Sequence, residues 1–291
     1  MPLDASPDFD AERRFGGARR LYGASALSTL AAAHVAVVGL GGVGSWTAEA
    51  LARTGIGALT LVDLDHIAES NVNRQIHALD ATLGQSKVDA MAARIQGIHP
   101  GCRVTRVDDF LTPDNVSEVL GPGITMVVDC TDQVSAKIAM VLHARARGLP
   151  LVVCGGAGGK TDPLALRAGD LSVAINDALL AKLRNQLRRN HGYPKAALVA
   201  GKPPKRIPKM QVRALWFDQP VRLPIPEAAV CEVDAAPANA PANAPADSPA
   251  AAPQGLSCAG YGSIVTITAA MGLVAANEVL QVLFPPATPK R

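Results

Sequence analysis

The chain has 291 residues, 48% of them hydrophobic, which excludes a protein too short or too polar to build a substantial core. Only 3% are aromatic, so the core must come mostly from Ala, Val, Leu and Ile, a composition that suits a parallel sheet covered by helices on both faces. The net charge of +3 excludes a uniformly basic or acidic protein, so a charged surface must come from a local cluster.

Neither a targeting signal nor a membrane span is expected from the apolar patterning. The first residues lack the basic and then apolar pattern of a signal peptide. The most apolar late stretch, residues 264–276, is shorter than the ~20 residues that a span needs, and we interpret it as a buried helix. We therefore expect a cytoplasmic protein.

In chain order, the first elements form a strand–helix–strand unit. Residues 1–33 are expected to form an N-terminal arm and a helix. An apolar strand over 35–38, a glycine loop, a helix over about 45–53 and a second strand over 59–63 follow. This βαβ arrangement is typical of nucleotide-binding α/β domains.

The alternation of strands and helices continues beyond this unit. Further helices are expected at about 87–96, 113–120 and 135–147, and further strands near 104–107, 124–129 and 151–154. The pattern predicts an α/β fold, with a Rossmann-like, doubly wound, mostly parallel sheet over residues 34–160 that binds ATP and a C-terminal extension.

Residues 161–291 change in pattern and are expected to form a basic, substrate-binding part. A basic helix at about 177–189 precedes a Pro-rich loop, a strand near 212–217 and a final helix at about 263–282. The Ala/Pro-rich segment at about 235–253 cannot bury a core and is predicted to be a disordered insertion.

One segment holds all of the positive excess. Between Lys182 and Arg213 there are ten basic residues and no acidic one, whereas the rest of the chain has 18 basic and 25 acidic side chains. A solvated helix face would explain a shorter run, but this one suits a polyphosphate or nucleic-acid surface. The candidate binding residues are Lys182, Arg184, Arg188, Arg189, Lys195, Lys202, Lys205, Arg206 and Lys209.

Five cysteines, at positions 102, 130, 154, 231 and 258, include no Cys-x-x-Cys pair. A structural zinc site is therefore not expected, and scattered thiols of this kind are usually buried. The roles of Cys154, Cys231 and Cys258 stay open.

A glycine motif, Gly39-x-Gly41-x-x-Gly44, lies between the first strand and the helix after it. Glycines there let the backbone turn tightly and approach a phosphate or ribose, and the helix N-terminus favours negative charge. Asp63 ends the next strand, where it can accept hydrogen bonds from ribose hydroxyls. The motif predicts nucleotide binding without distinguishing ATP from NAD.

Three charged residues favour ATP. Arg74, Lys87 and Asp132 are expected at the carboxyl edge of the sheet, where open α/β folds bind ligands. Arg74 and Lys87 can neutralise phosphates while Asp132 holds Mg²⁺. Alone, each could be a surface charge, a solvated helix residue or a helix N-cap, but the combination is more specific.

The order of these motifs resembles the ubiquitin-activating-enzyme-like family, which includes activators of sulfur-carrier proteins. The resemblance covers about Arg14 to Gly159 and implies an enzyme that binds ATP and Mg²⁺ and adenylates a carboxylate. It implies ATP contacts at Gly39, Gly41, Gly42, Gly44, Asp63, Asp65, Ser70, Asn71, Asn73, Arg74, Gln75, Lys87 and Asp132, with Asp132 as the metal ligand.

The same resemblance implies a homodimer in which an N-terminal arginine reaches the phosphates bound by the partner. Arg20 is the best match and Arg14 the second. The implied catalytic residues are therefore Arg20, Arg74, Lys87 and Asp132.

A finer resemblance, over most of the chain, is to the tRNA threonylcarbamoyladenosine dehydratases. It rests on residues 14–23, 41–46, 73–79, 155–159 and 257–262. It implies ATP-dependent cyclisation of the threonylcarbamoyl group on adenosine 37 of tRNA, and association with a cysteine desulfurase and its sulfur-acceptor protein. It leaves open a bound monovalent cation, Na⁺ or K⁺. The basic segment and the lack of paired cysteines agree with this branch.

Three other functions stay open. A sulfur-carrier activator would use the same ATP residues on a Gly-Gly carboxyl terminus, and carrier-stimulated ATP–pyrophosphate exchange would identify it. A non-catalytic nucleotide-binding scaffold would be separated by comparing ATP-Mg with NAD binding. An NAD oxidoreductase would need a His and an acid beside a hydride site, and the sequence shows no such pair.

Overall fold

The structure is a computed structural model, and it describes residues 9–195, 207–224 and 261–285. The helices in this part of the chain are α1 Ala11–Tyr22, α2 Ala26–Ala32, α3 Gly44–Thr54, α4 Lys87–Ile98, α5 Val116–Val119, α6 Val134–Arg147, α7 Ala178–Asn190 and α8 Val265–Leu283. The strands are β1 His34–Val38, β2 Ala58–Val62, β3 Arg103–Val107, β4 Met126–Asp129, β5 Leu151–Cys154, β6 Leu166–Asp170 and β7 Arg213–Phe217.

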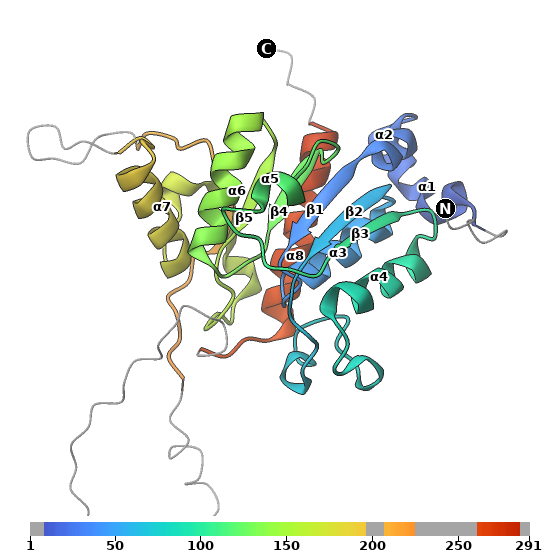
Figure 1. Ribbon diagram of the computed structural model, residues 1–291, viewed down its shortest axis with the longest axis horizontal. Coiled ribbons are helices and arrows are strands. Elements are labelled where there is room, and N and C mark those ends of the chain that lie inside the picture. The colour runs from blue at the N-terminus through green and yellow to red at the C-terminus, as the bar shows by residue number, and fades with distance from the viewer. Residues whose placement is uncertain (1–8, 196–206, 225–260, 286–291) are drawn as a thin grey trace, which may run out of the picture.

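The strands form one seven-stranded sheet in the order β3-β2-β1-β4-β5-β7-β6 (Figure 1). All neighbouring pairs are parallel except β6 and β7, which are antiparallel. Strands β1 to β3 are added towards one side of the sheet, and β4 and β5 are added on the other side of β1. The strand order therefore reverses between β1 and β4, and the parallel strands on either side of this point end at the same edge. Open α/β sheets bind ligands at this switch point, and here it lies beside the glycine loop.

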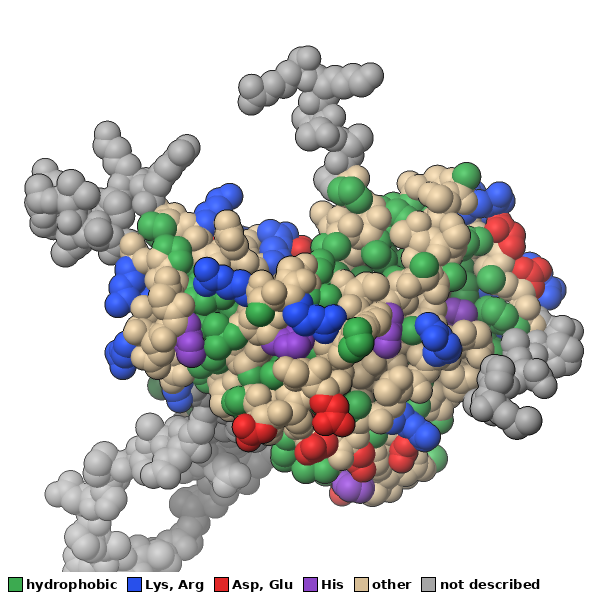
Figure 2. All heavy atoms as spheres, turned by 45° about the horizontal axis from the view of Figure 1, so that its top comes forward, with side chains coloured by type: hydrophobic (Ala, Val, Ile, Leu, Met, Phe, Trp, Pro, Cys, Tyr) green, Lys and Arg blue, Asp and Glu red, His purple; other side chains and the backbone are tan. Residues whose placement is uncertain are grey.

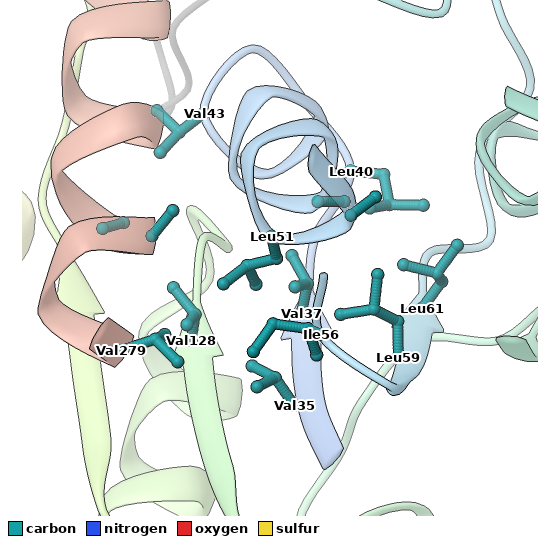
Figure 3. Close-up of a cluster of buried hydrophobic side chains, with 14 of the residues drawn as sticks. Val35, Val37, Leu40, Val43, Leu51, Ile56, Leu59, Leu61, Val128 and Val279 are labelled. Atoms are coloured by element: carbon teal, nitrogen blue, oxygen red, sulfur yellow. The ribbon is translucent and has the colours of Figure 1, made fainter. Parts of the chain in front are cut away.

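Helices cover both faces of the sheet, as expected for parallel strands. α3, α4 and α8 pack on one face, and α5, α6 and α7 pack on the other. Alternate residues of β1 supply the two cores: Val35 and Val37 face α3, whereas Ala36 and Val38 belong to the cluster under α6. Figure 3 shows the first cluster, with Leu51 of α3 and side chains of α8 against the strands.

The last helix, α8, is long and apolar enough by length and composition to cross a membrane, but it packs along α3 in the core. Gly272 is at their closest approach: a Cβ there would lie 2.5 Å from the carbonyl oxygen of Val43. The interpretation of this stretch as a buried helix agrees with that packing.

The predicted doubly wound α/β fold is confirmed, and three features differ from expectation. Two helices, α1 and α2, precede β1 where one helix was expected. The helix expected over 113–120 is only four residues long, because Asn115 side-chain atoms bond instead to the Thr112 N–H and the Phe110 carbonyl. β6 was not predicted from the sequence, since its residues at this sheet edge are half-exposed or exposed and form no apolar run. The segment at 235–253 lies outside the described residues.

Candidate active site at the carboxyl edge of the sheet

A cleft opens at the carboxyl edge of the sheet, where β1, β2, β4 and β5 end. Nine residues singled out in the sequence line it: Gly39, Gly41, Gly42, Asp63, Asp65, Arg74, Gln75, Lys87 and Asp132. They come from segments that are far apart in the chain, and the sheet topology brings them together. Gly44, Ser70, Asn71, Asn73 and Arg20 do not line this cleft.

The glycine loop leaves room for a ligand on one side only. Gly39 has φ +87°, and a Cβ on Gly44 would overlap the Gly39 carbonyl oxygen, so both positions require glycine. Gly41 faces the cleft with nothing within 4 Å of the place its Cβ would occupy. The backbone of the loop is therefore open to close approach by a phosphate or ribose.

Asp63, directly after β2, holds the glycine loop by hydrogen bonds. Its carboxylate accepts hydrogen bonds from the N–H of Leu40 at 2.6 Å and of Asp65 at 2.9 Å. Burial raises the pKa of Asp63, and the nearby Lys87 ammonium opposes that rise. Because each carboxylate oxygen has two lone-pair sites, Asp63 keeps acceptor capacity for ribose hydroxyls.

Lys87, at the start of α4, is the buried cation of the cleft. Its Nζ donates to Asp65 Oδ2 at 2.7 Å and lies 3.5 Å from Asp63 Oδ1. An ammonium has three donors, so Lys87 can keep the bond to Asp65 and still bond a phosphate oxygen. The two carboxylates hold the charge at this place in the cleft.

Arg74 lies in the loop between β2 and α4, which is bound to both α3 and α8. Its carbonyl accepts from Trp46 Nε1 at 3.0 Å and from Thr268 Oγ1 at 3.3 Å, and Asn73 Nδ2 donates to the Ser263 carbonyl at 2.7 Å. Asn71 accepts the Ala68 N–H. Asn71 and Asn73 therefore shape the loop that presents the Arg74 side chain to the cleft.

Asp132 is an exposed carboxylate at the cleft, with no hydrogen bond or ion pair to another described residue. It is not the N-cap of α6: that position is Gln133, which makes no side-chain cap bond. Its oxygens are free for a hard cation such as Mg²⁺.

Behind Asp132 lies a fully buried ion pair that the sequence motifs did not reveal. Lys137 Nζ donates to Asp129 Oδ1 at 3.1 Å and to the Cys154 carbonyl at 2.7 Å. Asp129 Oδ1 also accepts from the N–H and hydroxyl of Thr131. Burial raises the pKa of Asp129, and Lys137 opposes that rise. The pair fixes the ends of β4 and β5 against each other and so holds the backbone on which Asp132 stands.

Two cysteines meet beside this pair. Cys130 lines the cleft, and its Sγ lies 4.0 Å from that of buried Cys154. The contact with Cys130, together with burial, raises the pKa of the Cys154 thiol. Cys154 is thus kept as a neutral thiol, and Cys231 and Cys258 lie outside the described residues.

The cleft also contains residues that sequence reasoning missed. Phe110, 43% exposed, and Leu111 line it beyond β3, and Leu179, Ser263 and Thr268 line its other side. Gly155 and Gly156 follow β5, and the Gly156 N–H donates to Asp177 Oδ2 at 2.8 Å. Only the glycine run carried a signal in the sequence, because the other residues reach the cleft through tertiary packing.

The N-terminal arginines lie away from this cleft on α1. Arg14 donates to the Ile98 carbonyl at 2.6 Å and lies over the Phe9 ring, so it is engaged by residues of the same chain. Arg20 is exposed in the last turn of α1, and it makes no hydrogen bond or ion pair with another described residue. Its guanidinium is available to another molecule.

The basic segment divides into side chains that are engaged and side chains that are exposed. Arg184 donates to the carbonyls of Leu171 and Ala174, and Arg188 donates to that of Pro194. The exposed side chains are those of Lys182, Arg189, Lys195 and Lys209. Of the basic segment, the described residues 182–195 and 207–213 do not line the cleft, and Lys202, Lys205 and Arg206 lie outside the described ranges.

The chain is similar to known proteins over most of its length. The model of the ThiF family matches residues 17–290. The tRNA threonylcarbamoyladenosine dehydratase of Escherichia coli K12 is 42% identical over 270 residues, which are 92% of this chain and 92% of that protein. The protein of that name from Haemophilus influenzae is 37% identical over 273 residues, 94% of each chain.

A solved structure agrees over the whole fold. The crystal structure of the E. coli tRNA N6-threonylcarbamoyladenosine dehydratase in complex with ATP has a TM-score of 0.76 and 39% identity, and the match covers 97% of both chains.

Proposed function

The chain belongs to the ThiF family and, within it, to the tRNA threonylcarbamoyladenosine dehydratases, and from this membership we propose how its cleft carries out ATP-dependent dehydration of N6-threonylcarbamoyladenosine in tRNA. The observation that carries the proposal is the convergence of an open glycine loop, Lys87, Arg74 and Asp132 on one cleft. These groups suit a bound nucleoside triphosphate with its metal ion.

The first chemical step is adenylation. A carboxylate oxygen of the threonyl group attacks the α-phosphorus of ATP, the bond from that phosphorus to the bridging oxygen breaks, and pyrophosphate leaves. Lys87 and Arg74 neutralise the phosphate charge, and Asp63 holds the ribose. Such a site acts mainly through positioning and electrostatic stabilisation.

Mg²⁺ fits the cleft through Asp132, whose carboxylate is free and exposed at its wall. When bound, Mg²⁺ supplies positive charge at the phosphates, and it is commonly held by one or two carboxylates plus phosphate oxygens. A bound Na⁺ or K⁺ is implied by the resemblance to the family alone, and neither step of the reaction needs it.

The second step is ring closure. A nitrogen or oxygen within the same side chain attacks the acyl carbon, the bond from this carbon to the AMP oxygen breaks, and the attacking group loses its proton. AMP leaves with one former carboxylate oxygen, so the nucleoside has lost the elements of water. Intramolecular attack is favoured by proximity, and a nucleophilic cysteine is not required.

We place this activity in a cytoplasmic homodimer. The exposed Arg20 lies on α1, away from the cleft of its own subunit, and would reach the phosphates held by the partner. A cysteine desulfurase and its sulfur-acceptor protein remain proposed partners through the family. A sulfur-carrier substrate is not favoured, because the relatives matched over the whole chain carry the dehydratase name.

Nucleoside mass analysis tests the proposal. Threonylcarbamoyl-modified tRNA, incubated with the protein, ATP and Mg²⁺, should lose the mass of one water from the modified adenosine. Lys87→Ala and Asp132→Ala should each abolish the loss, because one removes the buried cation and the other the metal ligand. Unchanged tRNA while ATP is still consumed would contradict the proposal and favour a carrier-protein substrate.

A further inference from the structure

The two ends of α7 lie at opposite edges of the sheet. Its N-cap, Asp177, accepts the N–H of Gly156, which lines the cleft. Its other end leads to Tyr193, which forms a second hollow with Leu151 and Arg213, the first residues of β5 and β7. These parallel strands begin at the edge opposite the cleft. With 13 residues at ~1.5 Å each, α7 spans about 20 Å between the two edges.

The outer face of α7 carries a polar stripe along this path. Leu179, Leu180, Leu183 and Leu187 are buried. Lys182, Asn185 and Arg189 are exposed and follow one another at i, i+3 and i+7, so they lie on one face of the helix. We refer to these three residues as the α7 stripe. In Figure 1, α7 lies at the outer flank of the molecule.

The stripe continues beyond the helix at the far edge. Lys195 and Lys209 are exposed there, and Arg145 lies over the ring of Tyr193 with its guanidinium 4.7 Å from the ring centre. Acidic groups near this edge are already engaged: Asp170 accepts backbone N–H groups, and Glu278 pairs with Arg213. Figure 2 shows Lys and Arg side chains predominating on the left of this face, with most acidic ones elsewhere.

Helix stability alone does not explain this distribution. Basic residues in the last turn of a helix stabilise its C-terminus, which accounts for Arg189. It does not account for Lys182 in the second turn, or for Lys195 and Lys209 outside the helix. No Asp or Glu occurs in α7, so its lysine and arginines have no acidic partners within the helix, although solvated helix faces commonly mix both signs.

We propose that the α7 stripe, with Lys195 and Lys209, binds the backbone of the tRNA stem while the modified nucleoside enters the cleft at the opposite edge. The proposal rests on the proposed function for the identity of the RNA. A path of about 20 Å covers several stacked base pairs of an A-form RNA stem, whose rise per base pair is shorter than that of B-form DNA. Lys182 then contacts RNA near the reacting nucleoside, and Arg189, Lys195 and Lys209 contact it further along the stem.

Contacts of this kind give affinity and register without reading sequence. Lysine and arginine release counterions from phosphates, so binding should weaken steeply with salt. The engaged arginines, Arg184 and Arg188, instead hold α7 to its neighbouring segments and are unsuitable for substitution.

The test measures tRNA binding by titration and dehydration by nucleoside mass, with ATP binding measured alongside. Lys182→Glu and Arg189→Glu are compared with Arg103→Glu, which changes an exposed arginine at the start of β3, on the opposite flank of the sheet from α7. Each stripe variant should raise the Kd for full-length tRNA about 3- to 10-fold and reduce the salt slope by about one. ATP affinity should not change, and Arg103→Glu should behave as wild type.

Binding of a short anticodon stem–loop RNA distinguishes the contributions of the two ends of the stripe. Lys182→Glu should weaken binding of this short RNA as well, whereas Arg189→Glu and Lys209→Glu should affect mainly full-length tRNA. Stripe variants that bind full-length tRNA as Arg103→Glu does would overturn the inference. Failure of the wild-type protein to dehydrate bound tRNA would instead contradict the proposed function, because binding is measured independently.

Discussion

At the residue scale, His77 links the pH of the solution to stability. It is 2% exposed, and neither ring nitrogen has a hydrogen-bond partner among the described residues. Burial, with smaller contributions from the charges of Lys87 and Arg94, lowers its pKa to about 4 from the ordinary 6.5. Between about pH 6.5 and about pH 4, His77 therefore binds a proton in the unfolded chain but not in the folded protein.

The expected result is a loss of stability as the pH falls from about 6.5 to about 4, on the order of 3 kcal/mol from His77 alone. Burial also lowers the pKa of His34 and His99, which act in the same direction. Urea unfolding of wild type and His77→Gln at pH 7.5 and 4.5 isolates the contribution of His77. The variant should lose less stability between the two pH values, and an equal loss in both proteins would refute this role.

Also at the residue scale, the site could be predicted where its chemistry lies in short motifs. Lys87, Arg74, Asp132 and the glycines each follow a strand or open a helix, so their position at the sheet edge follows from the βα alternation. The Asp129–Lys137 pair could not be predicted as a pair, because its geometry and full burial appear only when α6 packs on the sheet. Phe110 and Thr268 reach the cleft through packing in the same way.

At the element scale, β1, β2, β4 and β5 were predictable because each contains a short apolar run bounded by turn residues. β3 contains no such run, and only Val104 and Val107 indicated it. β6 was not predictable, since its half-exposed and exposed residues gain their place by pairing with β7 rather than by their own pattern. The orientation of α7 relative to the sheet could not be predicted from the sequence either. Charge counting found its basic residues, but only the packing of α7 shows that the helix runs from the cleft edge to the opposite edge of the sheet.

At the scale of the whole molecule, the proposed homodimer needs two subunits to complete one site. Arg20 and Lys87 would act in the same site but come from different chains, so Arg20→Ala and Lys87→Ala should each be inactive as pure dimers. Subunits mixed at random should regain about a quarter of wild-type activity, because half of the dimers are mixed and each has one intact site. Dehydration assays of the mixture measure this directly.

A lack of recovery in the mixture, with subunit exchange shown by differently tagged chains, would place Arg20 in its own subunit's chemistry or outside the reaction. The matched control is a mixture of Lys87→Ala with Asp132→Ala. Both substitutions remove groups from the same cleft. Their mixed dimers should recover nothing beyond the level of either variant, because each cleft lacks one group.

Adenylation of the threonyl carboxylate is tested most directly by following oxygen atoms during turnover. Modified tRNA carrying ¹⁸O in the threonyl carboxylate is incubated with the protein and unlabelled ATP, and the nucleotide products are analysed by mass. Adenylation in the cleft predicts AMP containing one ¹⁸O atom, in an amount equal to the cyclised nucleoside. Label in inorganic phosphate with ADP as the product, or unlabelled AMP beside cyclised nucleoside, would contradict the account.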